Sequence, residues 1–188
     1  MRIVGGEFRS RPLAGPVTGG IRPTSDRLRE TLFDILIHRY GEPAPGARVL
    51  DLFAGTGALG LEALSRGAES CLLVEEDAAA RGLIRTNIEA LGLNGRARLF
   101  RRDATQLGPA GTILPFTLAF ADPPYGKGLG EAAMVSAAAG GWLSPGALCV
   151  VEEAAAAPVV WPAGFAPLDE RRVGDSQLCF ARWATGDG

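Results

Sequence analysis

The chain has 188 residues, of which 47% are hydrophobic and 21% charged, and this length suits one domain with a full core. The formal net charge of −2 does not by itself indicate nucleic-acid binding. No apolar run approaches the roughly 20 residues of a membrane span, and the first residues lack the apolar region of a secretory leader. These properties exclude a membrane-embedded chain and favour a cytoplasmic globular protein.

The cysteines and the distribution of charge narrow the possible functions further. Cys71, Cys149 and Cys179 lie far apart in apolar runs, so we expect buried free thiols in a reducing compartment. One histidine and no CxxC pair argue against a structural zinc site, and we predict no bound metal. Residues 1–40 carry seven arginines and four acids, or +3, which leaves −5 for residues 41–188. The basic first part is therefore the natural candidate for a surface that contacts phosphates.

Two elements are predicted in the first 40 residues. Residues 3–4 and 11–13 flank a loop that contains two glycines, and this pattern predicts a small hairpin. Apolar residues at helical spacing come after Arg22, and Thr24 or Ser25 is the expected N-cap of that helix. We therefore expect the basic segment to fold as a hairpin followed by a helix.

From residue 41 onward, predicted strands and helices alternate. The run 41–46 contains two prolines and predicts a linker, which divides a basic extension, 1–40, from a second domain, 41–188. The expected strands span 48–52, 70–74, 97–100, 117–121 and 147–151, and the expected helices span 57–66, 77–91 and 131–139. An antiparallel pair, 168–173 and 177–183, closes the chain. Repeated βα units with apolar strands predict an α/β fold, a parallel sheet covered by helices on both faces.

A glycine-rich loop follows the first strand of the second domain. Gly55, Gly57 and Gly60 match G-x-G-x-x-G, and Glu75 lies 20 residues after Gly55, as in a dinucleotide-binding fingerprint. Asp51, inside the strand end, argues against a dinucleotide, because its carboxylate would repel a pyrophosphate. That carboxylate suits the ammonium group of a methionine moiety. The alternative interpretation of Asp51 is a cap of the loop or of the following helix.

Two further acids follow strands at the same edge of the predicted sheet. Glu75 ends the second strand of the domain, where a carboxylate is well placed to accept both hydroxyls of a ribose. Asp103 follows the third strand and is a candidate acceptor for the amino group of adenine, with a solvated helix cap as the alternative. These acids favour a cofactor that contains adenosine.

The string Asp122-Pro123-Pro124-Tyr125 is the most informative in the chain. It follows the apolar run 116–121, and two adjacent prolines can neither continue a helix nor pair in a central strand. They predict a stiff turn with unpaired carbonyls, although an ordinary proline-rich loop is the alternative. Such a turn suits a planar group with an amino substituent. Asp122 and the Pro123 carbonyl would accept from the amine, and Tyr125 would stack on the ring.

In combination, these motifs resemble those of known methyltransferases. The run 51–57, Asp-Leu-Phe-Ala-Gly-Thr-Gly, with the turn 122–125 resembles the class I S-adenosylmethionine-dependent amino-methyltransferases. A resemblance to the bacterial RsmD family covers nearly the whole chain and rests on the runs 2–6, 9–11, 22–33 and 57–68. It implies a Rossmann-like, seven-stranded, mostly parallel sheet with an antiparallel last strand, preceded by the small hairpin and helix.

The resemblance also implies an activity. Members of that family methylate the exocyclic N2 of a guanine in 16S ribosomal RNA, so we expect S-adenosyl-L-methionine as cofactor and 16S rRNA, within a small-subunit ribosomal particle, as partner. We place the cofactor at Asp51, Phe53, Gly55, Gly57, Glu75 and Asp103, and catalysis at Asp122, Pro123, Pro124 and Tyr125. We expect phosphate contacts from Arg9, Arg11, Arg22, Arg27 and Lys127. For Arg27 and Arg29, the solvated face of a helix is an equal alternative.

Three alternative functions stay open on the sequence. An amino-methyltransferase that acts on DNA adenine or on a protein amide would use the same Pro-Pro-aromatic turn. A Rossmann NAD-dependent oxidoreductase would use the same glycine fingerprint. A non-catalytic RNA-binding subunit would be expected to have lost at least one of Asp51, Glu75 and Asp122, and this chain has all three.

Overall fold

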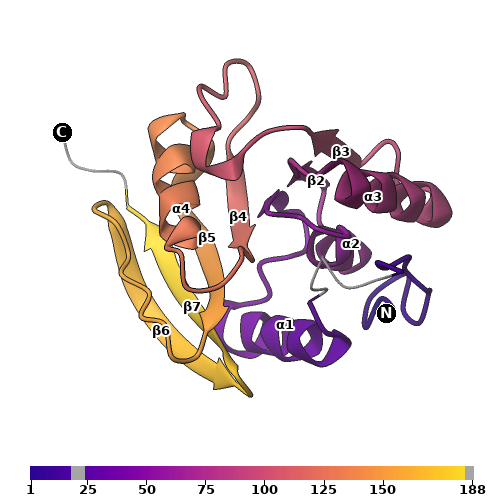
Figure 1. The fold of residues 1–188 in the computed structure, drawn as a ribbon, viewed down its shortest axis with the longest axis horizontal. Helices are drawn as coiled ribbons and strands as arrows, with labels where there is room; N and C mark the ends of the chain where they lie inside the picture. Colours follow the sequence, from indigo (N-terminus) through magenta and orange to yellow (C-terminus); the bar gives the residue numbers. More distant parts are fainter. Residues whose placement is uncertain (18–23, 185–188) are drawn as a thin grey trace.

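The computed structural model describes residues 1–17 and 24–184. The first elements are α1 (Asp26–Tyr40), β1 (Arg48–Leu52), α2 (Ala58–Ser65), β2 (Ser70–Val74), α3 (Ala78–Leu91), β3 (Ala97–Phe100) and the 3-10 helix η1 (Ala104–Gln106). Then follow β4 (Phe116–Ala121), α4 (Leu129–Ala139), β5 (Leu143–Ala154), β6 (Phe165–Val173) and β7 (Ser176–Trp183). Figure 1 shows a central sheet between layers of helices. The expected strands and helices of the second domain are all present, although β5 is longer than predicted at both ends.

The strands form one seven-stranded sheet in the order β3-β2-β1-β4-β5-β7-β6. The pairs from β3 across to β5 are parallel, and β7 is antiparallel to both of its neighbours, β5 and β6. The expectation of a mostly parallel sheet with an antiparallel last strand is therefore confirmed. The strand order reverses between β1 and β4, and the crevice at such a reversal is where open α/β sheets bind ligands.

Capping residues set the ends of two long helices. Ser25 is the N-cap of α1, and its side chain accepts a hydrogen bond from Leu28 N–H; Gly41 ends the helix with φ 71°. Asp77 caps α3 in the same way and Gly92 ends it with φ 66°. Both N-caps were among the expected residues, because short polar side chains satisfy the orphan N–H groups of a first turn.

The two faces of the sheet have separate apolar cores. Helices α1, α2 and α3 cover one face, where Val49, Leu73 and Phe120 belong to the same buried cluster as Phe33 of α1. Helix α4 and η1 cover the other face together with the fully buried Trp142. Side chains alternate between these faces along each strand. A residue at the end of a strand therefore lies on the same face of the sheet as the residue two positions before it.

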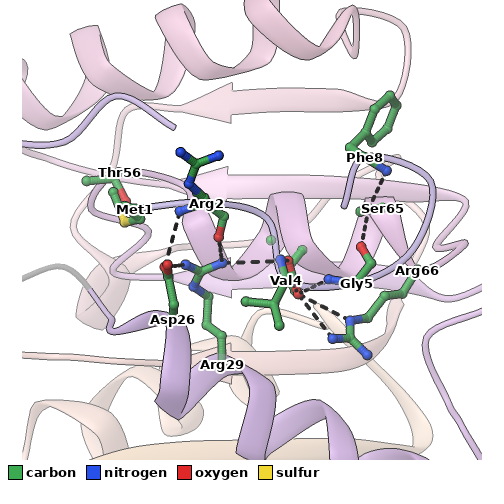
Figure 2. Close-up of polar contacts among 12 residues, drawn as sticks. Met1, Arg2, Val4, Gly5, Phe8, Asp26, Arg29, Thr56, Ser65 and Arg66 are labelled. Atoms are coloured by element: carbon green, nitrogen blue, oxygen red, sulfur yellow. Dashed lines mark hydrogen bonds and ion pairs between the residues drawn. The ribbon is translucent and has the colours of Figure 1, made fainter. Parts of the chain in front are cut away.

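We refer to residues 1–17 as the N-terminal segment, and this segment is docked against α2. The expected hairpin is present: Arg2 and Pro12 form an antiparallel bridge, Ile3 N–H donates to the Arg11 carbonyl at 3.0 Å, and Leu13 N–H donates to the Met1 carbonyl at 2.9 Å. The N–H groups of Val4 and Gly5 donate to the Glu62 carboxylate, at 3.0–3.1 Å, as Figure 2 shows. The segment is therefore held both by its own antiparallel pairing and by hydrogen bonds to α2.

The docked N-terminal segment is also held by a buried cluster of charged side chains. Arg29 and Glu62 are both fully buried, and Arg29 Nη1 lies 3.6 Å from Glu62 Oε2. Arg29 also pairs with Asp26 and donates a hydrogen bond to the Arg2 carbonyl at 2.8 Å (Figure 2). Burial lowers the pKa of Arg29, and the charges of Glu62 and Asp26 oppose that shift. The interpretation of Arg29 as part of a solvated helix face is therefore wrong, because α1 turns that side toward α2.

Two expectations about the chain as a whole can be compared with the structure. Cys71, Cys149 and Cys179 are buried free thiols, as expected. None of the helices within residues 1–17 and 24–184 has both the length and the apolar character that a membrane crossing requires.

Candidate active site

A large cleft opens at the carboxyl edge of the sheet. Its volume is about 1660 Å³, and it is lined by the loops after β1, β2, β3 and β4, by Glu152 of β5, by the start of α1 and by the β6–β7 turn. Its position matches the crevice at the reversal between β1 and β4, where the loops leave the sheet in opposite directions.

The strand register brings four residues of the cleft into one row. Leu52 is paired with both Val74 and Ala121, and Ala121 is paired with Val151. The next residue of each strand therefore lies at the same level of the sheet: Phe53, Glu75, Asp122 and Glu152. All four line the cleft. Three carboxylates and one aromatic ring are thus brought together by parallel pairing.

The glycine loop between β1 and α2 is held by Glu75. Phe53, Gly55 and Gly57 all have positive φ, at 57°, 60° and 82°. Gly55 N–H donates to one oxygen of Glu75 at 2.7 Å, and Asp77 N–H donates to the other at 2.9 Å. Phe53 is the only one of the three with a side chain, and a left-handed conformation there is the kind of local strain found at ligand sites.

Asp51 lies behind the glycine loop rather than on the wall of the cleft. It is 1% exposed, and its Oδ2 accepts from Gly60 N–H in the first turn of α2 at 2.9 Å. Burial raises the pKa of the Asp51 carboxyl to about 8, while the Gly60 bond acts in the opposite direction. A Cβ on Gly60 would lie 2.6 Å from Cys71 Sγ, so a glycine is required where the start of α2 packs against β2. Asp51 and Gly57 do not line the cleft, and Asp51 has the geometry of the alternative, a helix cap.

Asp103 caps η1, as one of its two interpretations expected, and it also lines the cleft. Its Oδ1 accepts from the N–H and the hydroxyl of Thr105, at 2.9 and 2.7 Å, and so caps η1. The residue also lines the cleft, beside Arg102. Asp103 is therefore both a cap and a wall residue.

The Pro-Pro turn is anchored at both ends by side chains from distant elements. Thr24 Oγ1 donates to Asp122 Oδ2 at 2.5 Å. The Tyr125 hydroxyl bonds to Glu152 of β5 and lies 2.9 Å from Ser176 Oγ of β7. Burial, with a further contribution from the Glu152 bond, raises the pKa of Tyr125 far above its ordinary value. The tyrosine is thus neutral, with its ring held at the cleft.

The basic residues predicted to contact phosphates are not all at the cleft. Arg27 lines it, near the start of α1. Lys127 is exposed two residues after Tyr125. Arg9 and Arg11 are exposed in the N-terminal segment, where Arg11 donates to the Ala90 carbonyl at the end of α3. Arg22 lies outside the described residues.

Three residues of the site did not emerge from the sequence: Thr24, Glu152 and Ser176. Glu152 directly follows the expected strand 147–151, as Glu75 follows the expected strand 70–74, so the same argument from strand ends would have found it. Thr24 was considered only as a helix cap. Ser176 carries no sequence signal, because it reaches the cleft only through the pairing of β7 with β5.

The sheet order, the single antiparallel strand and the cleft beside the glycine loop define a class I S-adenosylmethionine-dependent methyltransferase fold. The same fold occurs in an RNA methyltransferase from Salinibacter ruber in complex with S-adenosyl-L-homocysteine, with a TM-score of 0.66 over 89% of this chain and 97% of that one. At 14% sequence identity, that comparison concerns the fold alone.

More similar proteins define the family. The model of the family described as conserved hypothetical protein 95 matches residues 1–182. The chain is 43% identical to ribosomal RNA small subunit methyltransferase D of Escherichia coli K12, over 81% of this chain and 74% of that protein. The solved structure of yhhF from Escherichia coli is 34% identical, with a TM-score of 0.81 over 98% of both chains. The chain belongs to this family, the RsmD family.

Proposed function

We propose that this protein transfers a methyl group from S-adenosyl-L-methionine to the exocyclic N2 of a guanine in 16S ribosomal RNA. The observation that carries the proposal is the row at the carboxyl edge, which sets Asp122 and its Pro-Pro-Tyr turn beside Glu75 and the glycine loop. Family membership supports the coarser statement, a methyltransferase of ribosomal RNA, because a relative covering most of the chain carries that name.

The residues present fit an adenosylmethionine cofactor. Glu75 and Asp103 are carboxylates that line the cleft after neighbouring strands, at positions suited to a ribose and to an adenine amino group. Phe53 supplies an apolar wall. Asp51 and Gly57 do not line the cleft, but they set the shape of the glycine loop that borders it. When bound, the cofactor would supply an electrophilic methyl group.

The Pro-Pro turn supplies groups suited to an aromatic amine. Asp122 and the Pro123 carbonyl would accept hydrogen bonds from the two protons of the guanine amino group. These bonds favour a pyramidal nitrogen, whose lone pair is less delocalised into the ring and is aimed at the methyl group. As the new N–C bond forms, the nitrogen gives up one proton, to Asp122 or to water. Tyr125 would stack on the base after it leaves its neighbours in the RNA.

Basic residues around the cleft would hold the RNA backbone. Arg27 lines the cleft, and Lys127 is exposed two residues after Tyr125. Arg9 and Arg11 extend the basic surface along the N-terminal segment. Because the net charge is only −2, we propose that the substrate is a small-subunit ribosomal particle, whose shape adds to phosphate contacts.

The decisive experiment measures methyl transfer from radiolabelled S-adenosylmethionine to three substrates in parallel. These are unmethylated small ribosomal subunits, naked 16S rRNA and DNA, with mass spectrometry of the nucleosides formed. N2-methylguanosine from the ribosomal substrates alone is the expected result. N6-methyladenosine, or transfer to DNA, would contradict the proposal.

A matched pair of variants links any activity to the turn. Asp122→Ala removes the proposed acceptor, whereas Asp34→Ala removes an exposed acid of α1 at a position away from the cleft. We expect the first variant to be inactive and the second to match the unmodified protein. Equal activity of both variants would place the chemistry elsewhere.

A further inference from the structure

We infer that Glu152 determines the choice of base, by accepting a hydrogen bond from N1–H of the guanine whose amino group Asp122 holds. This inference rests on the proposed function and adds a residue for base selection to the site. Neither the glycine fingerprint nor the Pro-Pro turn includes Glu152, which follows them by at least 27 residues in the chain.

The sheet places Glu152 directly beside Asp122. Ala121 of β4 is paired with Val151 of β5 in parallel register, so the residues that follow them occupy neighbouring positions. In a parallel pair, residues in register direct their side chains to the same face of the sheet. Phe120 and Val150, two residues earlier on each strand, share the core cluster on the α1–α3 face. Both carboxylates therefore belong to that face, and both line the cleft.

Tyr125 joins the two acids into one binding surface. Its hydroxyl bonds to Glu152, and the negative charges of both Glu152 and Asp122 contribute to the rise of its pKa. Ser176 Oγ lies 2.9 Å from the same hydroxyl and fixes it from β7. The hydroxyl end of the proposed stacking ring thus lies near both acids, where the edge of a stacked base would meet them.

The chemistry of the pair selects guanine. Glu152 is only 6% exposed and accepts from the Tyr125 hydroxyl, and the two oxygens of a carboxylate can accept more than one hydrogen bond. A guanine presents three donor hydrogens on adjacent atoms, two on N2 and one on N1, and these match two neighbouring carboxylates. Adenine and cytosine instead present an unprotonated ring nitrogen next to the amine, so a carboxylate would face a lone pair. The pair therefore disfavours an adenine substrate, which the Pro-Pro turn alone does not.

The test compares guanine with 2-aminopurine at the position that the protein methylates. 2-Aminopurine keeps the amino group but lacks N1–H, so Glu152 would face an unprotonated nitrogen. The experiment uses small subunits reconstituted with either base and measures kcat/KM for the full chain and for Glu152→Gln. The glutamine keeps an acceptor for the Tyr125 hydroxyl and adds an NH2 that can donate to N1. We expect the preference for guanine to fall by about tenfold or more in the variant.

Two controls make the result specific. Glu153→Gln alters the next residue, which accepts from Gly126 N–H at 2.9 Å and does not line the cleft, so its base preference should be unchanged. A particle with 1-methylguanine tests the unmodified protein without any variant. That base keeps the amino group and O6 but has lost N1–H, and we expect transfer to it to fall at least about tenfold.

Three outcomes would count against the proposal. An unchanged guanine preference in folded Glu152→Gln, or efficient transfer to 1-methylguanine, would overturn the role of Glu152 while leaving the proposed function intact. Failure of the unmodified protein to methylate guanine in any ribosomal substrate would overturn the proposed function, and this inference with it.

Discussion

Thr24 Oγ1 donates a hydrogen bond to Asp122 Oδ2 across 98 positions of sequence, at 2.5 Å. One residue belongs to the segment that leads into α1, and the other begins the Pro-Pro turn after β4. The bond therefore joins the basic extension to the proposed catalytic turn. Extension and turn form a single site, because the cleft is lined by residues from both.

We expect Thr24→Val to lower kcat by about tenfold while leaving the KM for the cofactor unchanged. The reason is that a carboxylate that loses one hydrogen bond is less well oriented, and bonds to charged groups contribute about 1.5–3 kcal/mol. Thr24→Ser keeps the hydroxyl and should restore kcat. Steady-state kinetics on small subunits measures both values. Equal kcat in the valine and serine variants would show that the hydroxyl has no role.

Asp122→Ala should lower methyl transfer by at least about 100-fold, the usual scale for loss of an acid–base group. Cofactor affinity should stay within about threefold, because Asp103 and Glu75 are unaltered. Calorimetry with S-adenosylmethionine and a labelled-methyl assay separate the two effects. A large loss of cofactor affinity would instead assign Asp122 to cofactor binding.

Glu75→Ala should weaken cofactor binding by about tenfold or more, the effect of losing hydrogen bonds to a charged group. Glu75 also holds Gly55 N–H and Asp77 N–H, so part of the loss would come from a looser glycine loop. Glu75→Gln keeps an acceptor and should give an intermediate affinity by calorimetry. Glu89→Ala, an exposed acid of α3, is the matched control. Unchanged affinity in Glu75→Ala would refute its ribose role.

The buried Asp51 carboxyl should make stability depend on pH. Its pKa is about 8 in the folded protein against an ordinary value of 3.8, so between these values the folded state holds a proton that the unfolded chain has lost. Its contribution is therefore full below pH 3.8 and declines as the pH rises toward about 8, by up to about 1.4 kcal/mol per pH unit.

Urea unfolding at pH 5, 6.5 and 8 measures this dependence. Asp51→Asn removes the titration but keeps an oxygen that can accept from Gly60 N–H, so its stability should fall less between these pH values. Parallel pH profiles for the two proteins would mean that Asp51 is ionised throughout.

Removing the carboxylate at the centre of the buried ion cluster should destabilise the fold strongly. Glu62→Ala leaves Arg29 buried without its neighbour and frees the N–H groups of Val4 and Gly5, so we expect a loss of about 3–5 kcal/mol. Glu69→Ala, an exposed acid after α2, should change the free energy of unfolding by less than about 0.5 kcal/mol. Chemical denaturation of both variants provides the measurement.

A double variant tests the cause of that loss. Glu62→Leu combined with Arg29→Met replaces the ion pair by apolar groups and should recover part of the stability, since neither of the two fully buried charges remains. A double variant as unstable as Glu62→Ala would assign the loss to the undocked N-terminal segment instead.

Local signals in the sequence were sufficient for most elements of the fold. Apolar runs bounded by turn residues predicted the strands, and Asp77 with Gly92 marked both ends of α3. The hairpin was predicted as well, but the sequence did not show that its glycines also serve close packing: a Cβ on Gly6 would lie 2.0 Å from the Ser65 carbonyl oxygen. In the sequence alone, a glycine that is needed for contact with a helix far along the chain cannot be distinguished from a glycine of a turn.

The sequence by itself determined which residues follow strands, and so identified Glu75, Asp103 and the Asp122 turn, because strand ends follow from local apolar patterns. Only the tertiary structure decided the partners: Glu152 beside Asp122, Thr24 on its carboxylate, and Asp51 behind the loop rather than in the cleft. Each of these depends on register and burial between segments far apart in the chain. Pairing of that kind is set by long-range packing, which leaves no periodic signal near the residues concerned.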